Sequence, residues 1–122
     1  IITMKKKKIF CFDFDNVICK TTGGDYKNSI PNKKSINLIN DLFENGHIIK
    51  IFTARYMGRY KDNVKLVNKA GYKSTNKQLK KWGLKYHKLI MGKTSYDILI
   101  DDKAFGYKNN WVNIFKKRLK LK

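Results

Sequence analysis

Ile9-Phe10-Cys11-Phe12-Asp13-Phe14-Asp15-Asn16-Val17 is an apolar run that leads directly into two carboxylates. A short unbroken apolar run is typical of a strand that is buried on both faces in a parallel sheet. Because a lone carboxylate is costly to bury, Asp13 and Asp15 should lie where this strand ends and meets solvent. Ligands of open α/β sheets bind outside the carboxyl ends of strands, so the two acids are candidates for a site. An acidic turn that caps the next segment would have the same pattern.

The chain has 122 residues, of which 42% are hydrophobic and 13% aromatic. This composition excludes a fully disordered chain and suits one domain with one core. We therefore predict a single domain over residues 1–122, with flexible basic ends at residues 1–8 and 116–122.

The formal net charge is +19, from 28 Lys and Arg against 9 Asp and Glu. Such a charge favours anionic partners, which include phosphorylated metabolites, nucleic acid and acidic membrane surfaces. Only Arg55, Arg59 and Arg118 are arginines, the residue type suited to bidentate recognition of phosphates and bases. The lysines are equally explained as solvated surface, so a nucleic-acid role is the less favoured alternative.

The two cysteines, Cys11 and Cys19, form no CxxC pair or Cys/His cluster of the kind that binds zinc. We expect Cys11 to be a buried, reduced thiol in the first strand, and the protein to be cytoplasmic. The basic start and the apolar run after it are too short for a signal peptide or a membrane span. Whether the native chain starts at Met4, after residues 1–3, stays open.

Residues 16–30 contain Gly23 and Gly24 and predict an irregular flap beside the acids, or a plain connector. Pro31 suits the first turn of a helix whose apolar residues recur from Ile36 to Phe43 and which ends at residues 45–46.

Further along the chain, strand-like and helix-like segments alternate. Strands are predicted at residues 47–52, 86–91, 96–100 and 111–114, and helices at residues 64–71 and 75–82. This alternation predicts a three-layer Rossmann-like α/β fold, in which a parallel sheet has helices on both faces.

If these strands are neighbours, their carboxyl ends bring together four carboxylates, a hydroxyl and an ammonium group. The residues are Asp13, Asp15, Asp101, Asp102, Thr53 and Lys93. Clustered carboxylates repel one another unless a cation lies among them, and a site with oxygen ligands only suits Mg²⁺. Such a site is suited to phosphoryl transfer.

Three of these strand ends resemble motifs of the haloacid dehalogenase-like phosphatase superfamily. They are Phe12-Asp13-Phe14-Asp15-Asn16-Val17, Ile51-Phe52-Thr53-Ala54-Arg55 and Ile98-Leu99-Ile100-Asp101-Asp102-Lys103, and the likeness spans residues 9–104. The remaining motif of that superfamily is a single lysine, for which Lys93 is the first choice and Lys88 and Lys85 are rivals. Residues 92–97 and 101–104 resemble, more narrowly, small phosphatases of capsule and surface-polysaccharide synthesis.

The resemblance implies a role for each matching residue. Asp13 would be the nucleophile that forms an aspartyl-phosphate, and Asp15 the general acid and then the base. Phosphoryl oxygens would be held by Thr53, Lys93, Ala54 and Arg55. Mg²⁺ would be bound by Asp13, by the Asp15 backbone carbonyl and by Asp102 or Asp101. His47 and His87 are expected to be structural.

The implied activity is Mg²⁺-dependent hydrolysis of a small phosphorylated metabolite, such as a sugar phosphate. The alternatives are a polynucleotide or nucleotide phosphatase, and a non-catalytic binding protein with the same fold. Many relatives carry a cap domain over the site, but only about 37 residues separate Asp15 from Thr53 here. We therefore expect an open site, or one that a neighbouring subunit closes in a homo-oligomer.

Overall fold

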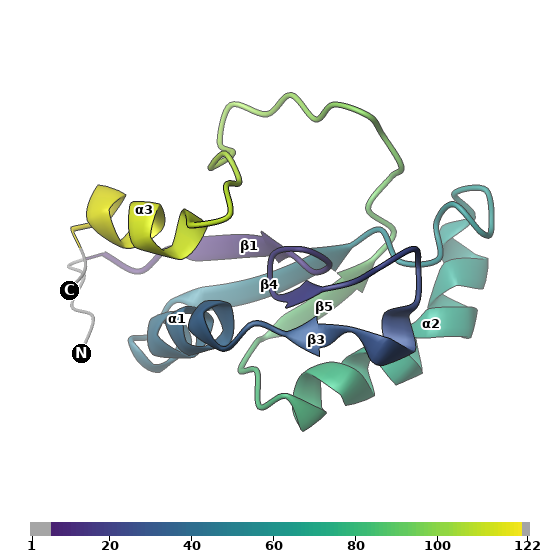
Figure 1. The fold of residues 1–122 in the computed structure, drawn as a ribbon, viewed down its shortest axis with the longest axis horizontal. Helices are drawn as coiled ribbons and strands as arrows, with labels where there is room; N and C mark the ends of the chain where they lie inside the picture. Colours follow the sequence, from purple (N-terminus) through teal and green to yellow (C-terminus); the bar gives the residue numbers. More distant parts are fainter. Residues whose placement is uncertain (1–5, 121–122) are drawn as a thin grey trace.

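A parallel three-stranded sheet forms the centre of the protein in the computed structural model, which describes residues 6–120. Its order is β1 (Ile9–Asp13), β4 (Ile48–Thr53) and β5 (Lys88–Met91), with β4 in the middle (Figure 1). The strands predicted at the first acidic motif, at residues 47–52 and at residues 86–91 are thus confirmed, the last as a shorter strand. The fold is mixed α/β, as expected.

Two helices connect the three parallel strands. α1 (Lys33–Glu44) precedes β4, and α2 (Val64–Lys81) runs between β4 and β5. An asparagine caps each amino end: the Asn32 Oδ1 accepts the Ser35 amide at 3.1 Å, and the Asn63 side chain caps α2 in the same way. The prediction that Pro31 lies in the first turn of the helix is wrong, because the asparagine cap starts the helix two residues later.

α2 is one continuous helix, where the sequence predicted two. Gly71, which was expected to end the first of them, lies buried in the middle. A Cβ atom at Gly71 would lie 2.3 Å from two ring carbons of Tyr56. Glycine therefore serves here to let the Tyr56 ring approach the helix closely.

One face of the sheet carries the core. Phe12, Ile51 and Leu89 lie side by side across the three strands, and all three are buried. α3 (Trp111–Arg118) covers β1 on this face, where the Trp111 ring lies 6.0 Å from that of Phe12.

The opposite face of the sheet is largely open. Ile9 on β1 and its partner Ile48 on β4 are 61% and 41% exposed there, and Cys11, two residues after Ile9 on β1, is exposed too. The prediction of a buried Cys11 is therefore wrong. A second helical layer is not seen between residues 6 and 120, because all three helices pack with the core residues on the other face.

Residues 92–110 form an irregular excursion that arcs away from the sheet and returns to α3 (Figure 1). The strand predicted at residues 96–100 is absent from it, because no neighbouring strand pairs with this segment in the described part of the chain. The edge strand predicted at residues 111–114 is also wrong: those residues begin α3, where Trp111, Val112 and Phe115 share a buried face.

The ends of the chain are only partly described. Residues 116–118 are helical, so the prediction of a flexible end is wrong for these residues. At the other end, the Lys8 amide donates to the His47 Nδ1 at 3.0 Å. Residues 1–5 and 121–122, and with them the question of a start at Met4, lie outside the described residues. No helix within residues 6–120 is long and apolar enough to cross a membrane.

Candidate active site

The flap after β1 is folded. It contains a small antiparallel ladder of β2 (Cys19–Lys20) and β3 (Ile30–Pro31), with a 3₁₀ turn, η1 (Tyr26–Asn28), between them. The Gln78 Nε2 on α2 donates to the Tyr26 carbonyl at 2.8 Å and ties the flap to that helix. The flap is therefore folded and bonded to α2, which corrects the expectation of an irregular loop.

Asp13 is the last residue of β1, and its side chain is 39% exposed. One carboxylate oxygen accepts the Phe14 amide at 2.8 Å, and the other lies 3.5 Å from the Lys93 Nζ. Burial raises the pKa of Asp13 above its usual value, although the Lys93 charge and the Phe14 hydrogen bond oppose this shift. Asp13 is thus a half-buried carboxylate that faces a cation.

Lys93 is the one of the three candidate lysines that reaches Asp13. It follows β5, and its amide donates to the Thr53 carbonyl at 3.1 Å. Lys88 begins β5 at the opposite end of the strand, and Lys85 pairs with Glu44. Burial lowers the pKa of Lys93, but its interactions with Tyr96 and Asp13 outweigh this effect, so that the net pKa is raised and the ammonium form is favoured.

Asp15 is held by Arg55. The Arg55 Nε lies 2.9 Å and its second terminal nitrogen 2.8 Å from the two Asp15 oxygens, which makes a bidentate pair. Only 2% of the Arg55 side chain is exposed, and its guanidinium lies 3.8 Å from the centre of the Phe14 ring.

Arg55 was expected to hold phosphoryl oxygens, but its nitrogens already have protein partners. Besides Asp15, the guanidinium donates to the Gln78 Oε1 at 2.7 Å and to the Ser29 Oγ at 3.2 Å. Its role in this structure is to position Asp15. Gln78 and Ser29 could not be predicted as members of the site, because both contacts with Arg55 span more than 20 residues.

Thr53 and Ala54 lie at the end of β4, next to this ion pair. The Thr53 Oγ1 accepts the Arg55 amide at 3.1 Å and, as a hydroxyl, keeps one proton to donate. Thr53 is fully buried, and Ala54 is half-buried. A hollow of about 290 Å³ opens between these strand ends and the flap, and both acids and Ala54 line it.

Two further residues of the site were missed in the sequence. Asn16 has a φ of 68°, a left-handed conformation that asparagine tolerates and that turns the chain sharply after Asp15. The Thr21 hydroxyl donates to Asp15 at 2.5 Å. An asparagine directly after an acidic strand end was the available signal for the turn.

Asp101 and Asp102 lie away from this cluster. Both are exposed in the irregular excursion after β5, and the Asp101 carboxylate accepts the Lys103 amide at 2.8 Å. Among the residues that the structure describes, no three His, Cys, Asp or Glu side chains lie close enough together to hold a metal ion. One chain therefore brings together Asp13, Asp15, Thr53, Ala54, Arg55 and Lys93, but not the predicted four-carboxylate site.

Both histidines have structural contacts. The His47 Nδ1 accepts the Lys8 amide and the His87 Nδ1 accepts the Ile49 amide, each at 3.0 Å. The His87 ring stacks on Phe43 at 4.6 Å. These contacts agree with the structural role expected for the two residues.

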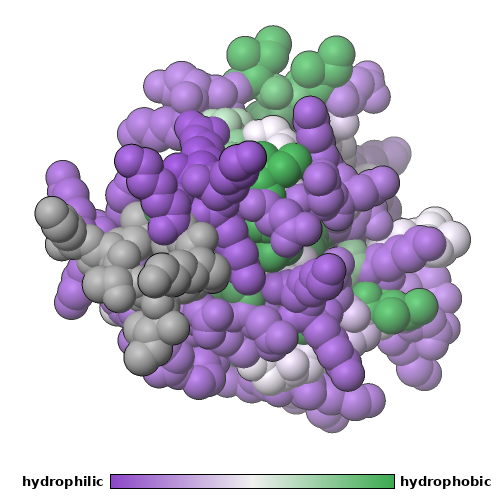
Figure 2. Space-filling view, turned by 60° about the vertical axis from the view of Figure 1, so that its left-hand side comes forward, coloured by the Kyte–Doolittle hydropathy of each residue, from purple (hydrophilic) through white to green (hydrophobic). Residues whose placement is uncertain are grey.

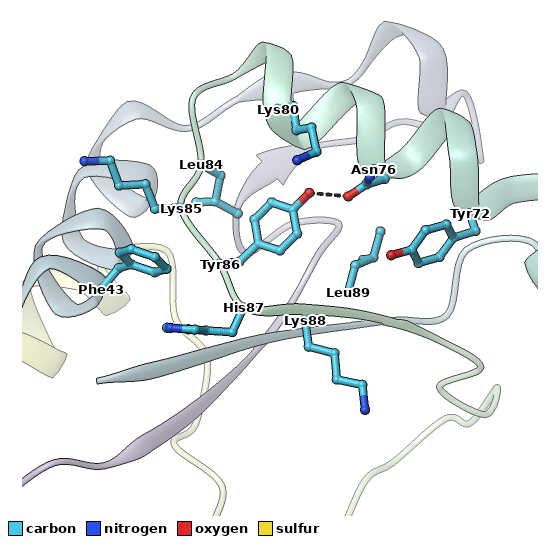
Figure 3. A pocket seen from close by; sticks show the side chains of 10 residues that line it. All are labelled: Phe43, Tyr72, Asn76, Lys80, Leu84, Lys85, Tyr86, His87, Lys88 and Leu89. Atoms are coloured by element: carbon cyan, nitrogen blue, oxygen red, sulfur yellow. Dashed lines mark hydrogen bonds between the residues drawn. The ribbon is translucent and has the colours of Figure 1, made fainter. Parts of the chain in front are cut away.

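A second hollow, of about 380 Å³, lies beside α2 at the amino end of β5 (Figure 3). Tyr86 and Tyr72 point into it, and Tyr86 donates to the Asn76 side chain. The described residues that line it include lysines but no acid or thiol, so the hollow offers no carboxylate or thiolate nucleophile. The candidate active site is therefore the smaller hollow at the carboxyl ends of the strands.

Comparisons with known proteins support the fold alone. No family model and no curated protein matches the sequence. A crystal structure of an MCSG target from Vibrio cholerae superimposes with a TM-score of 0.80 at 24% sequence identity, and the match covers 94% of each chain. The mixed α/β fold thus has a counterpart of nearly the same extent in a solved structure.

Proposed function

We propose that this protein is a Mg²⁺-dependent phosphomonoesterase that hydrolyses a small phosphorylated metabolite, such as a sugar phosphate. Its motifs resemble those of the haloacid dehalogenase-like phosphatases, which catalyse this type of reaction. The observation that carries the proposal is the pair of Asp13 and Lys93, 3.5 Å apart at the carboxyl end of β1. A half-exposed carboxylate next to an ammonium group can attack phosphorus while the cation offsets the charge of the phosphoryl oxygens.

In the proposed reaction, an Asp13 oxygen attacks the phosphorus atom and the bond from phosphorus to the ester oxygen breaks. Asp15 enters this step protonated and gives its proton to the leaving alcohol. The bidentate pair with Arg55 then holds the carboxylate that results. Water then attacks the aspartyl-phosphate, gives its proton to Asp15, and releases inorganic phosphate with Asp13 restored. Arg55 contributes by holding the Asp15 carboxylate in one place.

The surroundings of Asp13 support an anionic substrate of modest size. The net charge of +19 attracts phosphate esters from solution, and the Thr53 carbonyl accepts the Lys93 amide, which ties Lys93 to this end of the sheet. A hollow of about 290 Å³ lies at the lower limit of typical small-molecule pockets, which are roughly 300–1,000 Å³. The same charge and the open site support a polynucleotide phosphatase as the second candidate.

Magnesium would neutralise charge on the phosphoryl group when bound. In one chain, the Asp13 carboxylate and the Asp15 backbone carbonyl would be its ligands, and no three His, Cys, Asp or Glu side chains converge among residues 6–120. The ligand set within a single chain is thus too small for a divalent site, and no step above depends on the ion.

The test is hydrolysis of p-nitrophenyl phosphate with Mg²⁺ and with EDTA, followed by a panel of sugar phosphates, nucleotides and 5′-phosphorylated oligonucleotides. We expect turnover that EDTA abolishes and Mg²⁺ restores, and that Asp13→Asn removes. Asp41→Asn, which alters an exposed acid on α1, is the matched control and should leave turnover unchanged. Full activity in EDTA would contradict the metal requirement, and near-normal turnover by Asp13→Asn would contradict the mechanism.

A further inference from the structure

The excursion after β5 contains a segment, residues 96–102, that we call the arm. Its apolar side chains face solvent: Ile98 is 80%, Leu99 53% and Ile100 93% exposed. Figure 2 shows hydrophobic side chains gathered at the top of the molecule, where Figure 1 places the arm, above a mostly hydrophilic surface. A contiguous exposed apolar segment of strand-forming residues marks an interaction site.

β1 has an edge that no strand covers within the described residues. It pairs with β4 on one side, and its other side is free. Next to this edge, the open face of the sheet exposes Ile9 and Cys11. A free strand edge presents unpaired amide and carbonyl groups, which can be satisfied by an added strand.

The arm cannot reach this edge of its own chain in the parallel direction. Lys93 is held at the carboxyl end of the sheet by its bonds to Thr53 and Asp13. From Lys93 to Asp97 the chain spans at most about 14 Å. To start a strand beside Ile9, Asp97 would have to lie about 17 Å from Lys93 along the strand direction and about 14 Å from it across the sheet. The two displacements together give a distance of roughly 22 Å between Lys93 and Asp97.

Two further contacts hold the start of the arm away from β1. The Thr94 and Ser95 hydroxyls donate to the two Asp62 oxygens at 3.1 and 3.2 Å, next to the amino end of α2. Parallel strands also need a connection of about a dozen residues, and only four residues separate β5 from the arm. The arm can therefore serve as a parallel partner strand for β1 only in another molecule.

We propose that the arm of one chain adds as a parallel strand to the free edge of β1 in a second copy, and that it places Asp101 and Asp102 beside Asp13 of that copy. The arm carries three of the nine acids of a chain whose net charge is +19, so its charge complements the lysine-rich surface of the second copy. The exchange itself follows from the geometry above. That the two acids complete the metal site rests on the proposed function.

A disulfide can report this pairing directly. With Asp101 level with Asp13, Leu99 lies opposite Cys11, which is native and exposed. Neighbouring strands are about 4.8 Å apart, which lies within the Cα separation that disulfides allow. Leu99→Cys, treated with copper phenanthroline as oxidant, should therefore give a covalent dimer on a non-reducing gel.

Matched variants make the cross-link specific. Leu99→Cys combined with Cys11→Ser should give no dimer, and neither should Lys73→Cys, which places a thiol on the exposed side of α2. An intramolecular disulfide in Leu99→Cys would overturn the proposal, because it would show an antiparallel closure of the arm on its own chain. Absence of any disulfide with Cys11 would overturn it too.

Mixing two inactive variants tests the contribution of the acids. In a mixture of Asp13→Asn with the double variant Asp101→Asn/Asp102→Asn, mixed dimers hold one intact site, so turnover should recover to about a quarter of wild type after subunit exchange. No recovery, with an active wild type, would overturn the placement of the acids. If the wild type is inactive but Leu99→Cys gives cross-linked dimers, the proposed function is refuted and the exchange of the arm stands. If the wild type is active but no cross-link forms, the exchange is refuted and the proposed function stands.

Discussion

Arg55→Met tests the role assigned to the buried guanidinium. Arg55 is 2% exposed, donates to Asp15, Gln78 and Ser29, and stacks on Phe14. Methionine keeps much of the apolar stem, so the substitution removes the charge and the hydrogen bonds and leaves a smaller cavity than alanine would.

The expected loss of stability follows from the exposure of the two partners. Breaking a buried ion pair by removing one partner costs about 3–5 kcal/mol. Asp15 is still 22% exposed and keeps the Thr21 hydroxyl as a donor, so we expect a loss of about 3 kcal/mol, at the lower end of that range. In a domain of this size that loss corresponds to a fall in Tm of about 10–15 °C.

The assay is urea unfolding followed by circular dichroism, in parallel with a thermal scan. Arg59→Met is the matched control, because Arg59 is exposed and contributes only a contact of 5.0 Å with the Tyr56 ring. We expect that control to lose less than about 1 kcal/mol. Adding Asp15→Asn to Arg55→Met should recover part of the loss, because the uncompensated carboxylate is removed. A loss by Arg55→Met no greater than that of Arg59→Met would refute the reasoning.

Three further variants test the fold and the electrostatics. Asp13→Asn should raise the free energy of unfolding at pH 7, because burial raises the pKa of Asp13 and so disfavours its ionised form in the folded state. This gain over wild type should vanish below about pH 3.8, where wild-type Asp13 is protonated in both the folded and the unfolded state. Wild type should lose stability below pH 6.5, because burial lowers the pKa of His47 and only the unfolded chain takes up the proton there. His47→Asn should lose less stability over the same pH range, as measured by unfolding curves at pH 7.5 and 5.5. Gly71→Ala should cost about 1–3 kcal/mol in urea unfolding by driving a methyl group into the Tyr56 ring, whereas Gly58→Ala, with open space around it, should cost less. An equal loss in the two glycine variants would contradict the close packing of α2.

The strand ends were predictable from the sequence because each combines an apolar run with a polar stop. That pattern placed Asp13 and Thr53 at the carboxyl end of the sheet. Lys93 was the first choice among three lysines for the single-lysine motif, and the structure brings it to Asp13. Residues 96–100 have the same composition as a buried strand but lie exposed. Composition indicates that a segment favours the strand conformation. Whether the segment pairs with a sheet depends on how far the residues that connect it to the rest of the chain can reach.

The partner of Arg55 could not be predicted for a related reason. Its carboxylate lies 40 residues earlier in the chain and its amide partner 23 residues later, so no local spacing signals the contact. The unbroken helix α2 was hidden by Gly71, a helix breaker by propensity that the structure uses for close packing. In both cases a tertiary contact overrides the local signal.

Charge sets a condition on the proposed exchange between chains. Two copies with a net charge of +19 repel each other over long distances at low salt, whereas exposed pairs between arm acids and lysines contribute at most about 1 kcal/mol each. At physiological ionic strength the Debye length is about 8 Å, so the repulsion between whole chains is screened, while burial of the arm's apolar side chains does not depend on such screening. The fraction of dimer should therefore rise between about 10 and 150 mM salt in sedimentation velocity experiments. A fraction that falls over this range would show that charge pairs, and not the apolar strand, hold the two copies together.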